Sequence, residues 1–165
     1  MKKEMDKESL LFICLGNICR SPAAEAVMRK KLKEAGTGFD YITVDSAAIG
    51  PWHEGELPDK RMRKAGAKRG YEVNSVARQI RREDFSKFTY IIGMDHENMK
   101  ALNNLAESDE ERDKLLCAAD FMTRHPQYKT VPDPYYGGES DFELALDLIE
   151  DACDGIIEQI IKKHL

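Results

Sequence analysis

The hydrophobic residues of this chain gather in short continuous runs, which alternate with longer stretches where apolar and polar positions recur at helical spacing. Apolar runs at 10–13 and 90–94, and a mixed run at 41–46, are typical of strands buried in a parallel sheet. A fourth short strand is predicted near 115–118. The pattern therefore predicts four strands, distributed along the chain.

Amphipathic stretches follow these strands. Ser21 and Pro22 suit the N-cap and the first helical position of a helix that runs to about residue 36. Further helices are predicted at about 58–69, from Asp95 to about 106, and from 142 to the C-terminus. The charged segment 108–114 is expected to be a solvated turn or the start of a helix.

Alternating strands and helices indicate an open, mostly parallel α/β sheet, in which ligands bind at the carboxyl ends of the strands. A length of 165 residues with 42% hydrophobic content predicts one domain over 1–165, with residues 1–7 as a flexible N-terminal extension. No apolar run is long enough to span a membrane, and the charged N-terminus lacks the apolar core of a signal peptide. We therefore expect a cytoplasmic protein without a membrane partner.

The charge pattern narrows the function classes further. A formal net charge of -5 and the lack of a long Lys/Arg tract argue against nucleic acid as the main partner. Four cysteines without a secretory signal do not predict a disulfide framework, and the four histidines lack metal-ligand spacing. We expect neither a metal nor a cofactor.

The strongest chemical signal is the segment 14–21, between the first predicted strand and helix. Cys14 ends the strand and faces a helix N-terminus and Arg20, a setting that favours the thiolate and makes it a nucleophile. Backbone N–H groups of the loop would form an anion-binding nest, and the Arg20 guanidinium would clamp two oxygens of a phosphoryl group.

The other residues of this loop fit the same chemistry. Gly16 and Asn17 suit left-handed backbone conformations, and the Ser21 hydroxyl can donate a hydrogen bond to the Cys14 sulfur. By chance, roughly one chain in several hundred would carry Cys, Gly, Arg and Ser at the spacing of Cys14, Gly16, Arg20 and Ser21. The alternative is an ordinary strand-to-helix turn with a buried cysteine and a surface arginine.

From Cys14 to Glu25 the sequence resembles the low-molecular-weight protein tyrosine phosphatases, whose loop reads Cys-x-Gly-Asn-x-Cys-Arg-Ser-Pro-x-Ala-Glu. The resemblance continues through further segments: 45–47, Trp52, 77–80, 94–95 and 133–137. It implies a flavodoxin-like three-layer sandwich, with a four-stranded parallel sheet and helices on both faces. It also implies hydrolysis of phosphotyrosine in proteins through a cysteinyl-phosphate intermediate, without metal, and binding of inorganic phosphate or other oxyanions.

The resemblance assigns roles to further residues. Hydrolysis of an aryl phosphate needs a general acid, and the family places it at Asp133, although a residue between Pro132 and Pro134 could be only a rigid turn. Trp52 and Tyr135 are candidate aromatic walls for a phenyl ring, or packing residues. The predicted substrate-binding loop comprises Leu15, Gly16, Asn17, Ile18, Cys19 and Ser21.

Two positions bear on the branch of the family. Ser75 stands where the phosphotyrosine branch often has His, so support for Asn17 is expected to be weaker. Ile18 stands where phosphoarginine-directed relatives tend to have Thr, which favours phosphotyrosine. Asp95 could cap its helix or support catalysis.

Cys19 could form a reversible disulfide with Cys14 or be a small loop residue, whereas Cys117 and Cys153 are predicted to be buried or half-buried thiols. Four other functions share parts of this pattern: a phosphoarginine phosphatase, a thioredoxin-coupled arsenate reductase, a sugar-transport phosphocarrier and an inactive phosphopeptide-binding module. Arg20 and Asp133 speak against a stable phosphocarrier, and the presence of nucleophile, arginine and acid speaks against an inactive module.

Overall fold

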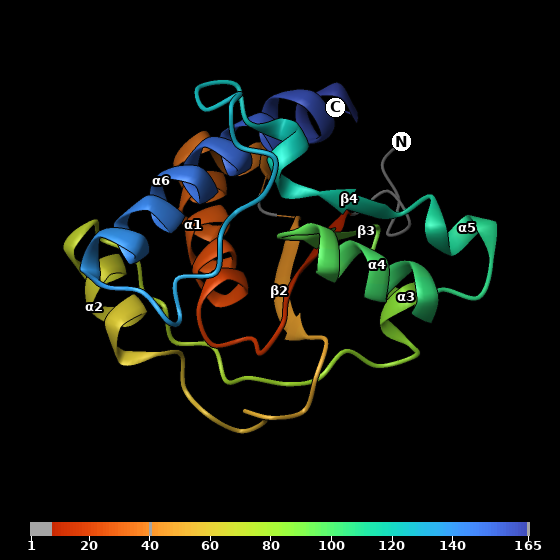
Figure 1. Cartoon of the computed structure of the whole chain (residues 1–165). Coiled ribbons are helices and arrows are strands. Elements are labelled where there is room, and N and C mark those ends of the chain that lie inside the picture. Colours follow the sequence, from red (N-terminus) through yellow and green to blue (C-terminus); the bar gives the residue numbers. More distant parts are fainter. Residues whose placement is uncertain (1–7, 40, 165) are drawn as a thin grey trace.

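The sheet has four strands, all parallel, in the order β2-β1-β3-β4 (Figure 1). This computed structural model describes residues 8–39 and 41–164, so the predicted N-terminal extension 1–7 lies outside the described residues. The strands are β1 Ser9–Cys14, β2 Thr43–Ala48, β3 Tyr90–Gly93 and β4 Leu115–Cys117. The predicted parallel sheet is confirmed.

Helices cover both faces of the sheet. They are α1 Arg20–Ala35, α2 Lys60–Lys68, α3 Asp84–Lys87, α4 His96–Leu105, α5 Asp109–Arg112 and α6 Glu139–Ile156. Short helical turns lie at Thr37–Phe39, Ala118–Phe121, Ile157–Ile161 and Lys162–His164. In Figure 1, α1, α2 and α6 lie on one side of the sheet and α3 and α4 on the other, which confirms the predicted three-layer sandwich.

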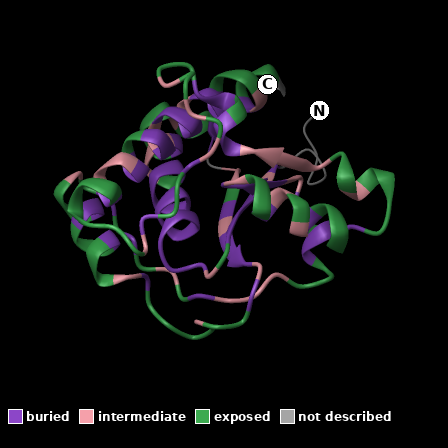
Figure 2. Cartoon of the chain, in the orientation of Figure 1, coloured by how far each residue is buried: buried purple, intermediate pink, exposed green. Residues whose placement is uncertain are grey.

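The core explains why β1 is continuously apolar. Leu10 and Phe12 of this strand face the cluster beneath α1 and α6, while Leu11 and Ile13 face the smaller cluster beneath α3 and α4. Successive side chains of a strand point to opposite faces, so a central strand with helices on both sides is apolar at every position. Figure 2 shows this buried centre between two partly exposed helical layers.

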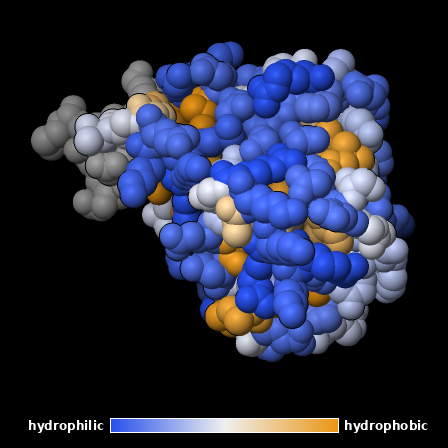
Figure 3. Space-filling model, turned by 90° about the vertical axis from the view of Figure 1, so that its left-hand side faces the viewer, coloured by the Kyte–Doolittle hydropathy of each residue, from blue (hydrophilic) through white to orange (hydrophobic). Residues whose placement is uncertain are grey.

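The outer face of the layer formed by α1, α2 and α6 is predominantly hydrophilic (Figure 3). One arginine connects two of these helices there: Arg69, just after α2, pairs with Glu143, Asp147 and Glu150 of α6. The predicted amphipathic pattern thus separates a buried face from a charged one.

Several predicted boundaries were wrong. Strand β2 lies two residues later than 41–46, because Ser9 pairs with Thr43 and Cys14 with Ala48. Helix α6 begins at Glu139 rather than 142, where Asp141 accepts a hydrogen bond from the backbone N–H of Gly138 (2.9 Å). The short helix α3 was not predicted.

The start of α1 also differs from the prediction. The helix begins at Arg20 with Cys19 as its N-cap, and no side chain caps it. Ser21 is not the cap, because its hydroxyl is engaged by Asn17 and Cys14 instead. In contrast, the predicted cap at Asp95 is confirmed: its carboxylate accepts from the Asn98 N–H at 2.8 Å.

Candidate active site

A pocket of about 310 Å³ opens at the carboxyl end of β1, where the chain passes into α1. Three separate segments line it: Cys14, Leu15, Gly16, Ile18, Cys19 and Arg20 from the loop, Trp52 and His53 after β2, and Asp133, Tyr135 and Tyr136 before α6. The pocket therefore lies where ligands bind in parallel α/β sheets.

Cys14 is buried at the base of this pocket and receives two hydrogen bonds from Ser21. Its sulfur lies 3.0 Å from the Ser21 Oγ and accepts from the Ser21 backbone N–H at 3.4 Å. Asn17 Nδ2 donates to the same Ser21 Oγ at 2.8 Å. Because that oxygen already accepts from Asn17, its own hydrogen is free to be donated to the Cys14 sulfur.

The backbone of the loop bends sharply at Asn17, which has a left-handed φ of 58°. The same expectation for Gly16 was wrong, since this glycine has no positive φ. Its lack of a side chain serves a close approach instead: a Cβ on Gly16 would lie 2.9 Å from the Cδ2 of His53. Asn17 and Ser21 do not line the pocket, because both are buried behind the loop.

Arg20 is buried beside the sulfur, with 2% of its surface exposed. Its Nη1 donates to Asp95 Oδ2 (2.7 Å) and to the carbonyl oxygen of Val131 (2.8 Å), while Nη2 lies 3.6 Å from Asp133 Oδ2. Burial alone would lower the pKa of the guanidinium, but the nearby charges of Cys14, Asp95 and Asp133 outweigh burial and raise it. Arg20 therefore carries a permanent positive charge at the pocket base.

One donor of Arg20 is left over. Its Nε–H is buried and has no hydrogen-bond partner within residues 8–39 and 41–164. Leaving a buried donor on a charged group unpaired is costly. An oxyanion in the pocket would satisfy this donor, which fits the predicted phosphoryl clamp.

Asp133 lines the pocket from the loop that leads to α6. Its Oδ1 accepts from the backbone N–H of Tyr135 at 3.1 Å, which is the turn geometry expected of an Asp before a tight bend. This loop is tied to the sheet, since the N–H of Val131 donates to the carbonyl oxygen of Met94 at 2.8 Å. The Asp133 side chain is 36% exposed, so one carboxylate oxygen can reach both Arg20 and a ligand.

Aromatic side chains form the rim. The Trp52 side chain is 64% exposed and lies against Gly50, where a Cβ would be 1.9 Å from its ring. Tyr135 and Tyr136 meet edge to face with ring centroids 4.9 Å apart. Arg61 holds this loop by donating to the carbonyl oxygen of Tyr135 at 2.9 Å. Such aromatic walls suit a planar ring.

The cysteines occupy different settings. All four are free, and Cys19 is buried in the loop, where burial and the charges of Asp59 and Cys14 raise the pKa of its thiol. Cys153 is buried and Cys117 is half-buried, as predicted, and neither lines the pocket.

Two pocket residues were not predicted, and one predicted helix cap has a second role. His53 and Tyr136 line the pocket, although neither was a predicted site residue. Asp95 does more than cap α4, since it also pairs with Arg20 across 75 residues of sequence. The neighbouring Trp52 and Tyr135 were the available signals for the first two.

The described part of the chain holds neither a metal-binding cluster nor a membrane-spanning helix. No group of three or more His, Cys, Asp or Glu residues there is arranged to hold a metal ion. No helix in that part is long and apolar enough to cross a membrane.

Comparison with known proteins gives consistent matches. Residues 9–165 match the model of a family described as low molecular weight phosphotyrosine protein phosphatase. The chain is 40% identical over 151 residues to the low molecular weight protein-tyrosine-phosphatase of Streptomyces coelicolor, covering 90% of this chain and 91% of that one. It is 39% identical over 160 residues to the low molecular weight phosphotyrosine protein phosphatase of Rattus norvegicus, covering 94% and 98%.

Among solved structures, a protein tyrosine phosphatase from Entamoeba histolytica with Hepes in the active site has a TM-score of 0.89 at 43% identity. The match covers 96% of this chain and 99% of that one. The similarity thus extends over nearly the whole length of both proteins.

Proposed function

Since the chain belongs to the low molecular weight phosphotyrosine protein phosphatase family, we propose that it hydrolyses phosphotyrosine in proteins through a phosphorylated Cys14. One observation carries the proposal: the Cys14 sulfur, the buried Arg20 and the Asp133 carboxylate converge on one pocket. These groups are a nucleophile, an oxyanion clamp and a proton donor.

In the first step, the Cys14 thiolate attacks phosphorus and the bond between phosphorus and the tyrosine oxygen breaks. Asp133 delivers its proton to that oxygen, so that tyrosine leaves as a neutral phenol. The backbone N–H groups of the loop and the Nε and Nη2 of Arg20 hold the phosphoryl oxygens, on which charge develops.

In the second step, the now ionised Asp133 takes a proton from water, the water oxygen attacks phosphorus, and the bond from sulfur to phosphorus breaks. The leaving thiolate is stabilised by the Ser21 hydroxyl, 3.0 Å away, and by the Ser21 backbone N–H. The products are inorganic phosphate and the regenerated Cys14 thiolate.

The pocket rim supports an aryl substrate. Trp52, Tyr135 and Tyr136 offer flat apolar surfaces around the entrance, which suit a phenyl ring better than an alkyl chain. Ile18 at the pocket wall adds an apolar contact where phosphoarginine-directed relatives tend to have Thr. Protein phosphotyrosine in the cytoplasm is the substrate class we propose.

An arsenate reductase is the second candidate on this fold. It requires additional cysteines that carry electrons from the nucleophile, but Cys153 is buried against α1, with its sulfur 3.9 Å from the carbonyl oxygen of Ala24. Cys117 and Cys153 are both outside the pocket lining. The positions of these thiols therefore favour the phosphatase.

The test is a substrate panel of peptides that carry phosphotyrosine, phosphoserine or phosphoarginine, together with arsenate plus thioredoxin. We expect the highest kcat/KM with phosphotyrosine, no arsenate reduction, and no turnover by Cys14→Ser, since an unactivated hydroxyl cannot replace the thiolate. A preference for phosphoarginine would overturn the substrate assignment. More than a few per cent of activity in Cys14→Ser would overturn the mechanism.

A further inference from the structure

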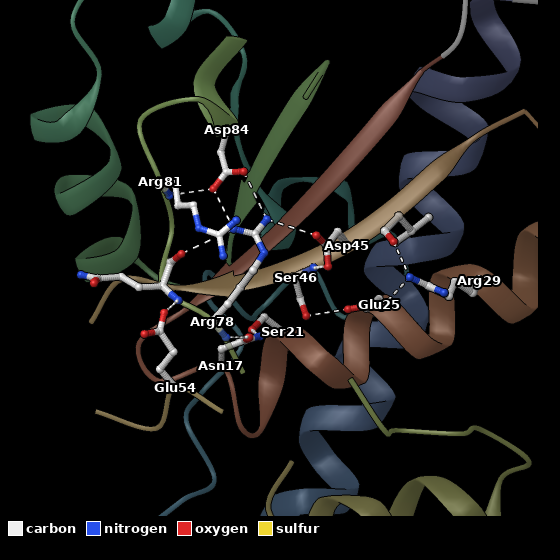
Figure 4. A network of polar contacts seen from close by, with 12 residues as sticks. Asn17, Ser21, Glu25, Arg29, Asp45, Ser46, Glu54, Arg78, Arg81 and Asp84 are labelled. Atoms are coloured by element: carbon white, nitrogen blue, oxygen red, sulfur yellow. Dashed lines mark hydrogen bonds and ion pairs between the residues drawn. The ribbon is translucent and has the colours of Figure 1, made fainter. Parts of the chain in front are cut away.

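An arginine outside the pocket is held by two carboxylates directly behind the loop. Arg78 pairs with Asp84 of α3 (2.9 Å and 3.2 Å) and with Asp45 of β2 (3.1 Å). Figure 4 shows the guanidinium between these two carboxylates. Its side chain is 17% exposed and that of Asp84 is 3% exposed, so the pair is largely shielded from water.

The charges of this group depend on each other. Burial alone would lower the pKa of Arg78, but the hydrogen bonds and charges of Asp84 and Asp45 outweigh it and raise the pKa. Asp84 also accepts from the Arg81 backbone N–H at 2.7 Å, which fixes its position at the start of α3. The result is a rigid ionic group that connects β2 to α3.

The residue that carries this guanidinium also donates its backbone N–H to the loop. The Arg78 N–H donates to Asn17 Oδ1 at 3.1 Å, and the Arg78 carbonyl oxygen accepts from Ala48 N–H at 2.7 Å. The segment 77–80 therefore lies along the end of β2, with its amide directed at the loop. Ser75 makes no hydrogen bond to Asn17, because its buried hydroxyl has no hydrogen-bond partner within residues 8–39 and 41–164.

The Arg78 N–H fixes the orientation of the Asn17 side chain. A backbone N–H can only donate, so the atom of Asn17 that faces it must be the carbonyl oxygen, and the NH₂ group must face Ser21. If the amide were turned by 180°, its oxygen would accept the Ser21 hydroxyl hydrogen. The Cys14 sulfur, which lies 3.0 Å from Ser21 Oγ, would then no longer receive that hydrogen bond.

We propose that Arg78 is a positioning residue for the reaction: held by Asp84 and Asp45, it keeps the Asn17 amide turned so that the Ser21 hydroxyl donates to Cys14. The kinetic consequence rests on the proposed phosphatase function. The consequence for the Cys14 sulfur does not, because a thiolate without its hydroxyl donor is less stable in any reaction. Weaker support for Asn17 was expected because Ser75 replaces a histidine. In the structure, however, both the NH₂ group and the carbonyl oxygen of the Asn17 amide are hydrogen-bonded.

The test is a double-mutant cycle between Arg78→Gln and Ser21→Ala, with Arg81→Gln as the matched control. Arg81→Gln removes the same charge as Arg78→Gln. It is a control because Arg81 is exposed and its side chain has no hydrogen bond or ion pair to other residues of the described segments. We expect Arg78→Gln to lower kcat/KM by roughly 10- to 100-fold, the range that a hydrogen bond to a charged group typically contributes. In the Ser21→Ala background the further loss should be less than about threefold, because the hydroxyl on which Arg78 acts is absent.

A second measurement needs no turnover. The rate of Cys14 alkylation by iodoacetate at pH 6 reports the thiolate population, and it should fall in Arg78→Gln but not in Arg81→Gln. Asp45→Asn, which keeps the pair with Asp84, should show smaller changes of the same kind and is the variant to use if Arg78→Gln does not fold. Equal losses of kcat/KM in both backgrounds, or an alkylation rate like that of Arg81→Gln, would overturn the proposal. A change in alkylation without phosphotyrosine turnover would instead overturn only the proposed function.

Discussion

Replacing Arg20 by lysine tests whether one edge of its guanidinium is bonded within the protein while the other edge binds the phosphoryl group. One edge of the side chain is used structurally, with Nη1 bonded to Asp95 and to the carbonyl oxygen of Val131. The other edge, Nε and Nη2, remains for the phosphoryl oxygens. A lysine ammonium keeps the charge but presents one nitrogen, so it cannot serve both edges from the same buried position.

The size of the effect follows from these contacts. Arg20→Lys forfeits two hydrogen bonds to a charged phosphoryl group, each contributing about 1.5–3 kcal/mol. A combined loss of about 3–6 kcal/mol corresponds to a fall in kcat/KM of roughly 10²- to 10⁴-fold. The affinity for vanadate or inorganic phosphate should fall in parallel, because the same two donors bind the free oxyanion.

The assay compares kcat/KM for p-nitrophenyl phosphate and the inhibition constant of vanadate in wild type and Arg20→Lys. Arg124→Lys is the matched control, because Arg124 also bonds a carboxylate, Asp154 at 3.1 Å, but lies outside the pocket lining. Urea unfolding of each protein separates a folding defect from a binding defect. A loss of less than about fivefold in a folded Arg20→Lys variant would refute the bidentate clamp.

Three further outcomes are expected. Asp133→Asn should lower the burst rate by about 10²- to 10⁴-fold with phosphotyrosine but less with p-nitrophenyl phosphate, because a phenolate of pKa near 10 needs the proton and p-nitrophenolate does not; identical leaving-group dependence in both enzymes would mean that Asp133 is only a turn residue. Mild peroxide should inactivate the enzyme reversibly through a disulfide between Cys14 and Cys19, whereas irreversible Cys14 sulfinic acid beside reduced Cys19 on peptide mass spectrometry would contradict it. Burial would raise the pKa of Asp151, but hydrogen bonds from Thr123, His125 and Arg124 outweigh it and lower the pKa. Its contribution to stability is therefore complete above the ordinary aspartate pKa of about 4 and is lost as pH falls through the lowered pKa of the folded state. Asp151→Asn should cost about 1.5–3 kcal/mol of unfolding free energy at pH 7 by urea titration and progressively less as pH falls below about 4, and a difference independent of pH would contradict this reasoning.

The parts of the site that lie close together in sequence could be predicted, because their geometry is local. The step from the apolar run of β1 to Cys14, and from there into α1, follows from the strand pattern and from the residues of the loop. The left-handed Asn17 was predicted for the same reason. The predicted Ser21 cap was wrong because a hydroxyl group near a helix start can bond to several partners. Here it bonds to the Cys14 sulfur and to Asn17 instead of to the backbone of the helix.

The contacts between distant segments could not be predicted from spacing. Asp95 lies 75 residues from Arg20, and the Arg78 amide lies 61 residues from Asn17, so neither pairing leaves a periodic signal. The polar residues within β2 also obscured the bounds of this strand, which was predicted two residues too early. Asp45 lies in the middle of that strand, because Arg78 supplies the ionic partner that an isolated strand would lack.

The two carboxylates beside Arg20 differ in a way that separates their chemistry. Asp95 is 24% exposed and bonds Nη1 at 2.7 Å while it also caps α4, so its charge is committed to the guanidinium and the helix. Asp133 is more exposed, lies 3.6 Å from Nη2 and accepts a hydrogen bond from a backbone N–H of its own loop. A general acid needs a carboxylate oxygen that can reach the leaving group. Both oxygens of Asp95 are bonded within the protein, and Asp95 does not line the pocket, whereas Asp133 does. This contrast favours Asp133 as the residue that exchanges protons with the leaving group and water, and Asp95 as the residue that holds Arg20 in place.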